Sequence, residues 1–338
     1  MTGVSASNHE IVYDCLKDGK KSCPTCGSFS VIKWGYQNKK QRFKCKECGL
    51  FYFWRNDHIK LNRQFVWFKK WILERQIYRT LSRDKKQSAR NIQRLFKKYL
   101  LAAPEYPIRS KERAHLIIDG TYFNNNMCLV LYHDHDIRYI QLHRLTDRER
   151  YEEVKEDLEN LKKLGVEIES ITCDGHRAEL KAIRKVYPRI VIQRCLFHIQ
   201  RMARVWLTSR PQTDCAKELL ILTQQLMGLN TREKIHQWMH DIHRWEERHI
   251  EFINERSINP FTSRTWYKHK MIRRVRTLLK RAWFNLFHYI DNDQIPKTTN
   301  ALEGYFSHLK NHLNIHRGLT LQHRIGFIKW YLYFNNVR

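Results

Sequence analysis

The chain has 338 residues, enough for two or three domains, and it carries a net charge of +28. Such an excess of Lys and Arg favours a polyanionic partner such as DNA, because each phosphate contact releases counterions. No run approaches the ~18 apolar residues of a membrane span, and the first 15 residues lack the apolar stretch of a secretory signal. Nine cysteines without secretory context argue against disulfides, so we expect a cytoplasmic, nucleoid-associated protein with no membrane partner.

The charge is distributed in three blocks along the chain. Residues 1–110 carry 24 basic and 8 acidic residues, and residues 200–338 carry 23 and 11, whereas residues 111–199 carry 15 of each. Two basic flanks therefore enclose a neutral block. We expect the neutral block to hold catalytic metal and the flanks to grip DNA; the alternative is a solvated basic surface.

Residues 1–58 contain two C-x2-C pairs separated by 18 residues, a spacing typical of a four-thiolate zinc site. Gly27 and Gly49 follow the two pairs and suit tight knuckles. Three short β-rich runs lie between residues 30 and 54, and a segment this small needs metal for its folding energy. A redox C-x-x-C would need a βαβ pattern, which does not surround these pairs. The sequence predicts a zinc ribbon whose structural Zn2+ is bound by Cys23, Cys26, Cys45 and Cys48.

Residues 59–110 are predicted to form a helix-turn-helix region that ends in a linker marked by two prolines. We expect a short helical segment at 77–81 and a turn at 82–87. Ser88 would cap a last helix that enters a major groove of DNA. The basic residues that this helix offers to DNA are Arg90, Arg94, Lys97 and Lys98.

Residues 111–198 show strands and helices in the order βββαβαβ. The strands are predicted at 114–123, 126–134, 137–146, 170–175 and 189–195, and the helices at 147–165 and 177–188. This order is that of a ribonuclease H-like core, an α/β fold in which the first and fourth strands are neighbours. Asp119 and Asp174, each at the end of a predicted apolar strand, would then lie close together.

Three acidic residues stand in distinctive contexts: Asp119 in IDGTYF, Asp174 in CDGH and Glu303 in NALEGYF. Converging carboxylates can hold the two divalent ions that cut and join phosphodiesters. Each acid has a plainer alternative, because Asp-Gly pairs are typical of turns and Glu303 stands at capping-box spacing from Asn300. If Glu303 only caps a helix, the third acid would be Glu251, Glu255, Asp291 or Asp293.

These motifs, together with the C-x2-H of Cys195 and His198, resemble the Asp-Asp-Glu transposases of bacterial and archaeal insertion sequences. The similarity is greatest to the group that includes Mutator-like elements, and it covers most of the chain. The predicted zinc ribbon and helix-turn-helix, which precede the core in this chain, are similar to arms found in related insertion-sequence transposases. The resemblance implies that Asp119, Asp174 and Glu303 bind two Mg2+ or Mn2+ ions, and that His198 supports the catalytic site by contacting phosphate or positioning the second Asp.

The resemblance also implies an all-helical insertion at residues 199–292 and C-terminal core helices at 293–338 that carry the third acid. In related transposases an aromatic residue of the insertion stacks on a displaced base, a role that Trp206 would fill here. The alternative is that Trp206 packs in the core. Basic helix faces that would follow DNA phosphates include Arg273, Arg274 and Lys310.

The predicted function is a DNA transposase that binds the terminal inverted repeats of an insertion sequence, cuts DNA and transfers the 3′ end to target DNA. Both ends must be joined, so we expect a homodimer or larger assembly on double-stranded DNA. Two alternatives stay open. One is a domesticated, non-catalytic DNA-binding regulator, and the other is a ribonuclease H-like nuclease or resolvase.

Overall fold

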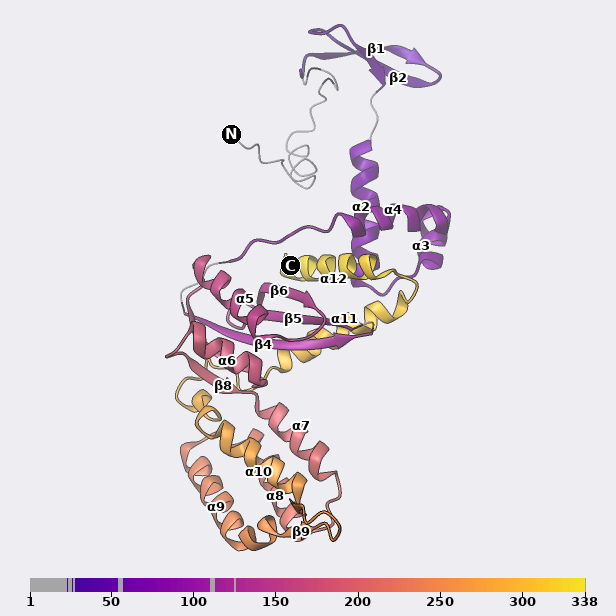
Figure 1. The fold of residues 1–338 in the computed structure, drawn as a ribbon. Coiled ribbons are helices and arrows are strands. Elements are labelled where there is room, and N and C mark those ends of the chain that lie inside the picture. Colours follow the sequence, from indigo (N-terminus) through magenta and orange to yellow (C-terminus); the bar gives the residue numbers. More distant parts are fainter. Residues whose placement is uncertain are drawn as a thin grey trace. The chain divides into compact units, whose positions relative to one another are not determined.

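The computed structural model of the chain describes residues 23, 26, 28–53, 57–109, 113–124 and 126–337 (Figure 1). Gly27 and the first 15 residues, on which two expectations above rest, lie outside these residues. The chain forms two compact units. The core unit spans Tyr106–Asn311, and the terminal unit combines the described residues before Tyr106 with His312–Arg338.

The terminal unit begins with a three-stranded antiparallel sheet. Its strands are β1 (Val31–Gln37), β2 (Lys40–Cys45) and β3 (Phe51–Phe53), in that order. Asn38 and Lys39 both have positive φ, which gives the two-residue turn that matches the twist of paired strands. β2 ends at Cys45, earlier than expected, because the chain turns at Gly49, whose φ is +73°. One cysteine pair therefore precedes β1, whereas the second pair begins at the last residue of β2 and ends in the turn before β3.

Three helices follow the small sheet: α2 (Asp57–Leu73), α3 (Tyr78–Lys85) and α4 (Ala89–Leu101). The Ser88 hydroxyl accepts a hydrogen bond from Asn91 N at 3.2 Å, so the predicted cap of the last helix is confirmed. Residues 82–85, expected in a turn, instead continue α3. No glycine or proline interrupts the helix before Lys86, which ends it with a φ of +50°.

The last helix of the chain, α12 (Leu321–Asn336), packs against α2 and α4. Trp330 Nε1 donates a hydrogen bond to Tyr99 O at 2.7 Å. Gly326 approaches the backbone so closely that a Cβ there would lie 1.9 Å from Leu100 O. This contact leaves room only for glycine at position 326.

Residues 293–338 were expected to belong to the core, whereas the structure groups His312–Arg338 with the amino-terminal helices. The physical reason is an aromatic cluster. Phe334 packs against Phe65 and Phe68 of α2, with ring centroids 5.8 and 6.4 Å away, so α12 buries its aromatic side chains inside the terminal unit. The boundary between the units falls within α11 (Asn300–Ile315).

The core unit contains a five-stranded mixed sheet in the order β6-β5-β4-β7-β8 (Figure 1). The antiparallel strands are β4 (Ala114–Phe123), β5 (Met127–Asp134) and β6 (Tyr139–Thr146). The parallel strands beyond β4 are β7 (Ile168–Cys173) and β8 (Val191–Arg194). Two helices connect them, α5 (Tyr151–Lys163) and α6 (Arg177–Val186). The predicted α/β class and the adjacency of the first and fourth core strands are confirmed.

The two faces of this sheet have different partners. Leu116 and Ile118 of β4 share a buried cluster with Leu158 of α5 and Ile183 of α6. Because side chains alternate along a strand, Asp119 points to the opposite face. The helices therefore leave one face of β4 and β7 for other segments of the chain.

An insertion separates β8 from α11 and has its own buried core. Its helices are α7 (Leu196–Leu207), α8 (Asp214–Gln225), α9 (Arg232–Asn254) and α10 (Lys270–Ala282). Trp238 Nε1 donates to Leu222 O at 2.7 Å, and Trp245 Nε1 donates to Cys215 O at 3.0 Å, so both tryptophans serve packing. No described helix, including the 23-residue α9, is apolar enough over a sufficient length to cross a membrane.

The prediction that the insertion is entirely helical is wrong. β9 (Arg256–Ile258) and β10 (Thr265–Tyr267) form an antiparallel hairpin between α9 and α10. α9 ends at Asn254, and Pro260 lies in the turn between the two strands. The Asn259 side chain accepts the N–H groups of two following residues and so builds the turn.

Candidate active site

The segment before α11 is fixed across the face of the sheet that α5 and α6 leave open. His115 Nε2 of β4 lies 3.3 Å from Gln294 Oε1. Thr172 Oγ1 of β7 donates a hydrogen bond to Pro296 O at 2.8 Å. These contacts bring the start of α11 to β4 and β7, although the segments are far apart in sequence.

Asp119 lies inside β4 and not at the end of a strand, since β4 continues to residue 123 and Asp119 pairs with Leu131. The expected strand end is therefore wrong, and so is an Asp-Gly turn here. Gly120 lies against the Glu149 side chain, since a Cβ at position 120 would lie 2.1 Å from Glu149 Oε1. Burial raises the pKa of the Asp119 carboxyl to about 7, although the positive charge of His198 acts to lower it.

Three side chains form a group that could hold a metal ion. One ligand atom each of Asp119, His198 and Glu303 lies within 4.8 Å of the others, and the three come from β4, α7 and α11. Glu303 Oε1 is 3.5 Å from His198 Nε2, and it is buried without a hydrogen bond to any described residue. A buried carboxylate oxygen without a donor is costly, and a bound cation would satisfy it. The residues present therefore fit a divalent cation.

The capping-box alternative for Glu303 lacks its expected geometry. α11 begins at Asn300, so Asn300 is the first helical residue and not the cap. Thr299 O, one residue earlier, accepts the N–H groups of Leu302 and Glu303. Glu303 is thus the fourth residue of the helix, one position beyond that of a capping box.

The replacement acids considered for the third position lie elsewhere. Glu255 is paired with Lys268 and with His269 in the hairpin region of the insertion. Asp291 Oδ1 lies 2.7 Å from Arg232 Nη2. Among the described residues, no candidate metal-binding group includes Glu251, Glu255, Asp291 or Asp293.

Thr299 joins the C-x2-H motif to α11. Thr299 N and Oγ1 lie 3.3 and 3.5 Å from the sulfur of Cys195, and Thr299 Oγ1 lies 3.4 Å from His198 Nδ1. Burial lowers the pKa of His198, but the hydrogen bond and charge of Cys195 and two nearby carboxylates raise it to about 9. At neutral pH the imidazole is therefore a cation beside Glu303.

Asp174 follows β7 directly and lies level with Asp119, because the register of the parallel pair β4–β7 leads to both residues. Its Oδ1 accepts His176 N at 2.7 Å, and its carbonyl accepts two hydrogen bonds from Arg194. Asp174 is not a member of the three-residue group, but its charge helps to raise the pKa of Asp119 and of His198.

Sequence reasoning missed two further acids at this site. Glu149, in the connection from β6 to α5, lies against Gly120. Glu179, in the first turn of α6, is only 4% exposed, accepts Gly175 N at 3.3 Å and hydrogen-bonds to Asp174. Burial, with the charge of Asp174, raises the pKa of both carboxyls. Glu179 has a weak sequence signal, since acids are common in the first turn of any helix, and Glu149 lies in a connection without a motif.

The four predicted cysteines of the terminal unit come together. Cys23 Sγ lies 3.5 Å from Cys48 Sγ, and Cys26 Sγ lies 3.6 Å from Cys45 Sγ. All four sulfurs are within 4.8 Å of one another. A tetrahedral ion with Zn–S bonds of ~2.3 Å would separate its sulfurs by ~3.8 Å, so the cluster has the dimensions of a metal site.

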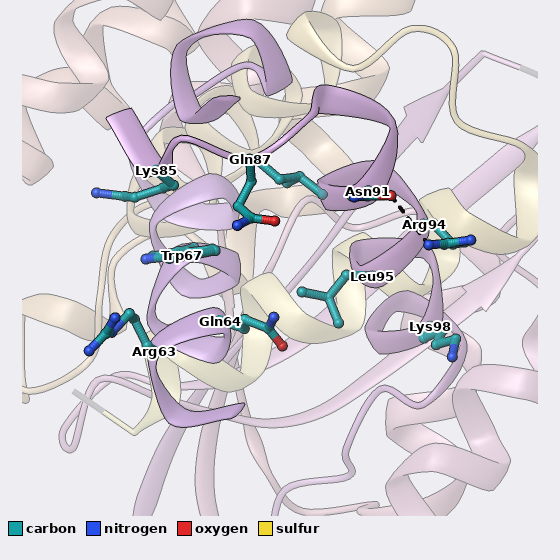
Figure 2. A pocket seen from close by; sticks show the side chains of 10 residues that line it. Arg63, Gln64, Trp67, Lys85, Gln87, Asn91, Arg94, Leu95 and Lys98 are labelled. Atoms are coloured by element: carbon teal, nitrogen blue, oxygen red, sulfur yellow. Dashed lines mark hydrogen bonds between the residues drawn. The ribbon is translucent and has the colours of Figure 1, made fainter. Parts of the chain in front are cut away.

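The predicted DNA-contacting residues of α4 divide into two sets. Arg94 and Lys98 line a groove of about 700 Å³ between α2 and α4, whereas Arg90 and Lys97 are exposed outside it. Figure 2 shows Gln64 of α2 and Leu95 of α4 pointing into the space between the helices. The other groove residues include Arg63, Trp67, Lys85, Gln87 and Asn91.

The predicted DNA-contacting residues of the core unit are also separated. Trp206, Arg273 and Arg274 line one cavity, and the Arg274 guanidinium lies 4.2 Å from the centre of the Trp206 ring. Lys310 lies elsewhere, with its Nζ 5.5 Å from the centre of the Phe123 ring.

A sequence model of a transposase family, the Mutator family, matches residues 136–318. The matched segment contains Asp174, His198 and Glu303, whereas Asp119 precedes it. A search of curated proteins finds no match. A transposase cuts DNA and joins it at another site, so the family implies an enzyme that acts on DNA. Because the match covers more than half of the sequence, the chain belongs to the Mutator family of transposases.

Proposed function

We propose that the core unit performs metal-dependent DNA cleavage and 3′ end transfer, with Asp119, Asp174 and Glu303 as the metal-binding acids. The observation that carries the proposal is the convergence of Asp119, His198 and Glu303 within 4.8 Å. Asp174 lies on the neighbouring strand, level with Asp119. Two of these acids, Asp119 and Asp174, belong to the electrically neutral block of residues 111–199, and three acids at one site suit a reaction at phosphate.

We further propose that the core unit is ribonuclease H-like. Three antiparallel strands followed by two strands parallel to the first support this assignment. The position of α5 and α6 on one face of the sheet also supports it, because the opposite face then remains for the acids. The insertion between β8 and α11 lies between the second and third acids of the sequence.

The ions that fit this site are two Mg2+ or Mn2+ ions, held by Asp119, Asp174 and Glu303. When bound, such ions lower the pKa of the attacking water or 3′ hydroxyl and stabilise the leaving oxygen. The raised pKa of His198 favours its protonated form, which cannot bind a metal ion. In that form the imidazole would pair with the Glu303 carboxylate, whose Oε1 lies 3.5 Å from Nε2, or contact a substrate phosphate.

Neighbouring residues would hold these acids in place. Arg194 fixes the backbone of Asp174 through its carbonyl, and Glu179 hydrogen-bonds to the Asp174 side chain. Thr299 and Cys195 orient the imidazole of His198. A supporting shell of this kind limits the motion of the acids before the ions and the DNA bind.

For the terminal unit we propose recognition of the terminal inverted repeats. The four cysteines would bind a structural Zn2+, and α3 and α4 would form the helix-turn-helix. The groove between α2 and α4 presents amides next to cations, such as Gln64 and Asn91 beside Arg94. Amide side chains read adenine edges and cations contact phosphates, so this groove would contact the element end, with Arg90 and Lys97 as additional phosphate contacts.

The active assembly would be a homodimer or larger complex, because a transposition event joins two element ends. The net charge of +28 supports association with double-stranded DNA and with the nucleoid. Trp206 keeps its proposed role as a base platform, with one face of its ring covered by Arg274. Lys310 would contact phosphate beyond Glu303.

Cleavage and strand transfer on a labelled element end test this proposal directly. The full-length chain is incubated with Mg2+ or Mn2+, and the wild type is compared with Asp119→Asn and Asp174→Asn. We expect both variants to bind the end as the wild type does and to give neither cut nor joined product. A wild type that binds and never cuts would make the chain a DNA-binding regulator. Cutting without joining would make it a nuclease.

A further inference from the structure

The cavity lined by Trp206, Arg273 and Arg274 begins at the residue that follows Asp174. It encloses about 840 Å³ and is lined by the β7–α6 turn, by α7 and by one side of α10. Gly175 and Arg177 come from the turn, and Arg274 and Arg281 come from α10. We call this cavity the arginine cleft.

The cations of the arginine cleft are not neutralised within the described part of the chain. Arg177, Arg274 and Arg281 are exposed and form no ion pair with a described residue, and no described acidic residue lines the cleft. Arg276, on the same helix but outside the cleft, is paired with Glu246. Gathering unpaired cations around one space costs Coulomb energy, which a bound anion offsets.

One of these cations lies against an aromatic ring. The guanidinium carbon of Arg274 lies over the Trp206 ring, 4.2 Å from its centre. Stacking restrains the plane of a guanidinium while its N–H donors stay available for a bidentate contact with phosphate. The cleft thus has a prepared phosphate donor as well as an excess of charge.

The position of the cleft links it to the proposed catalytic acids. Gly175 has a φ of +80°, and a Cβ there would lie 1.9 Å from the Arg194 guanidinium carbon. Arg194 in turn donates two hydrogen bonds to the carbonyl of Asp174. The wall of the cleft and the backbone of Asp174 are therefore parts of one packed turn.

We propose that the arginine cleft binds the backbone phosphates of one DNA strand next to the scissile phosphate, and so acts on cleavage and not on recognition of the element end. This inference rests on the proposed function, because nearness to Asp174 matters only if Asp174 serves the reaction. A cavity of this volume is in the range that takes a single small molecule, so it admits one or two nucleotides of one strand and not a duplex.

The test combines a charge-removing variant with a charge-removing change in DNA. Arg274→Gln/Arg281→Gln removes two cleft charges in the full-length chain. The substrate is a duplex with one element end in which single phosphates near the cleavage site are replaced by neutral methylphosphonates. We expect the variant to cut ~10–100-fold more slowly, with end affinity within ~3-fold of wild type. One or two methylphosphonates should slow the wild type and have no further effect on the variant.

A matched control separates the cleft from general charge loss. Arg201→Gln/Arg204→Gln removes two exposed charges from α7 outside the cleft. This control should cut at the wild-type rate and keep the full methylphosphonate effect. The inference is overturned if the cleft variant cuts as fast as this control. It is also overturned if every methylphosphonate slows the cleft variant by the same factor as it slows the wild type. If the wild type itself never cuts, the proposed function fails, and this inference fails with it.

Discussion

The chain has two clusters of side chains that could hold a metal ion, and they are built in different ways. The four sulfurs of the terminal unit come from residues 23–48, around a sheet of three short strands. Asp119, His198 and Glu303 come from β4, α7 and α11, and the insertion helices α8, α9 and α10 lie between the last two elements. The first cluster is local in sequence, and the second depends on the fold of the whole core unit.

This difference predicts opposite relations between metal and folding. A small sheet with few buried side chains needs its metal to fold, so metal binding and folding are one event in the ribbon. The core unit has an extensive buried core and holds its acids against the sheet without an ion. A metal there would be required for chemistry and not for the fold.

The largest effect is expected from the carboxylate cluster. Glu303→Gln should reduce cleavage at least ~10³-fold, because it removes a ligand charge that the transition state needs. Far-ultraviolet circular dichroism and end binding should remain unchanged. The matched control is Glu255→Gln, which removes a paired glutamate of the insertion hairpin. Equal loss of cleavage in both variants would contradict the assignment of Glu303 as the third acid.

The next effect should come from the sulfur cluster. Cys45→Ala should release zinc and weaken end binding ~10-fold or more, since the ribbon would lose its folding energy. A chromophoric chelator measures the metal, and fluorescence anisotropy measures binding. Cys215→Ala, a cavity-forming change in the core of the insertion, should keep its zinc. An unaltered zinc content in Cys45→Ala would show that the four sulfurs do not share an ion.

A smaller effect is expected at the junction between α7 and α11, where Thr299 joins the C-x2-H motif to the helix that carries Glu303. Cys195→Ala should slow cleavage ~10-fold, because Thr299 and His198 lose a common partner. Cys195→Ser should restore the rate to within ~3-fold of wild type, since its hydroxyl can accept both bonds. A purely structural role would leave the titration of His198 unchanged, whereas we expect its pKa, followed by NMR, to fall in Cys195→Ala.

The contrast between the clusters also explains what the sequence could predict. The four sulfurs follow from one spacing pattern, and the structure brings all four together. For the core, the order of strands and helices was enough to predict that β4 and β7 are neighbours, and this places Asp174 level with Asp119. Local patterns decide such features, because apolar periodicity and connection lengths fix which strands can pair.

The features that sequence reasoning missed depend on contacts between distant segments. Glu149 is not marked by any local motif, and only the packing of the β6–α5 connection brings it to Gly120. The membership of α12 in the terminal unit follows from aromatic partners on α2 and α4, which periodicity within α12 cannot identify. The hairpin of the insertion was missed because its strands have only three residues each.

The smallest effect concerns the stability of the metal-free protein. The pKa of Asp119 is raised by burial to about 7, compared with 3.8 for an ordinary Asp. Below about pH 4 the carboxyl is protonated in the folded and unfolded states, so it does not affect folding. As pH rises toward 7, the unfolded state loses its proton first, and the folded state is progressively destabilised. The amide of Asp119→Asn cannot ionise, so the variant is not destabilised in this way as the pH rises.

We therefore expect metal-free Asp119→Asn to be more stable than the metal-free wild type by about 1–3 kcal/mol at pH 8, and by clearly less at pH 5. Thermal melting in chelator at the two pH values measures the difference. Added Mg2+ should stabilise the wild type more than the variant, because only the wild type has the full set of ligand charges. An equal gain at both pH values would indicate a packing effect. A loss of stability at pH 8 would show that the Asp119 carboxylate is already compensated by its protein neighbours in the absence of metal.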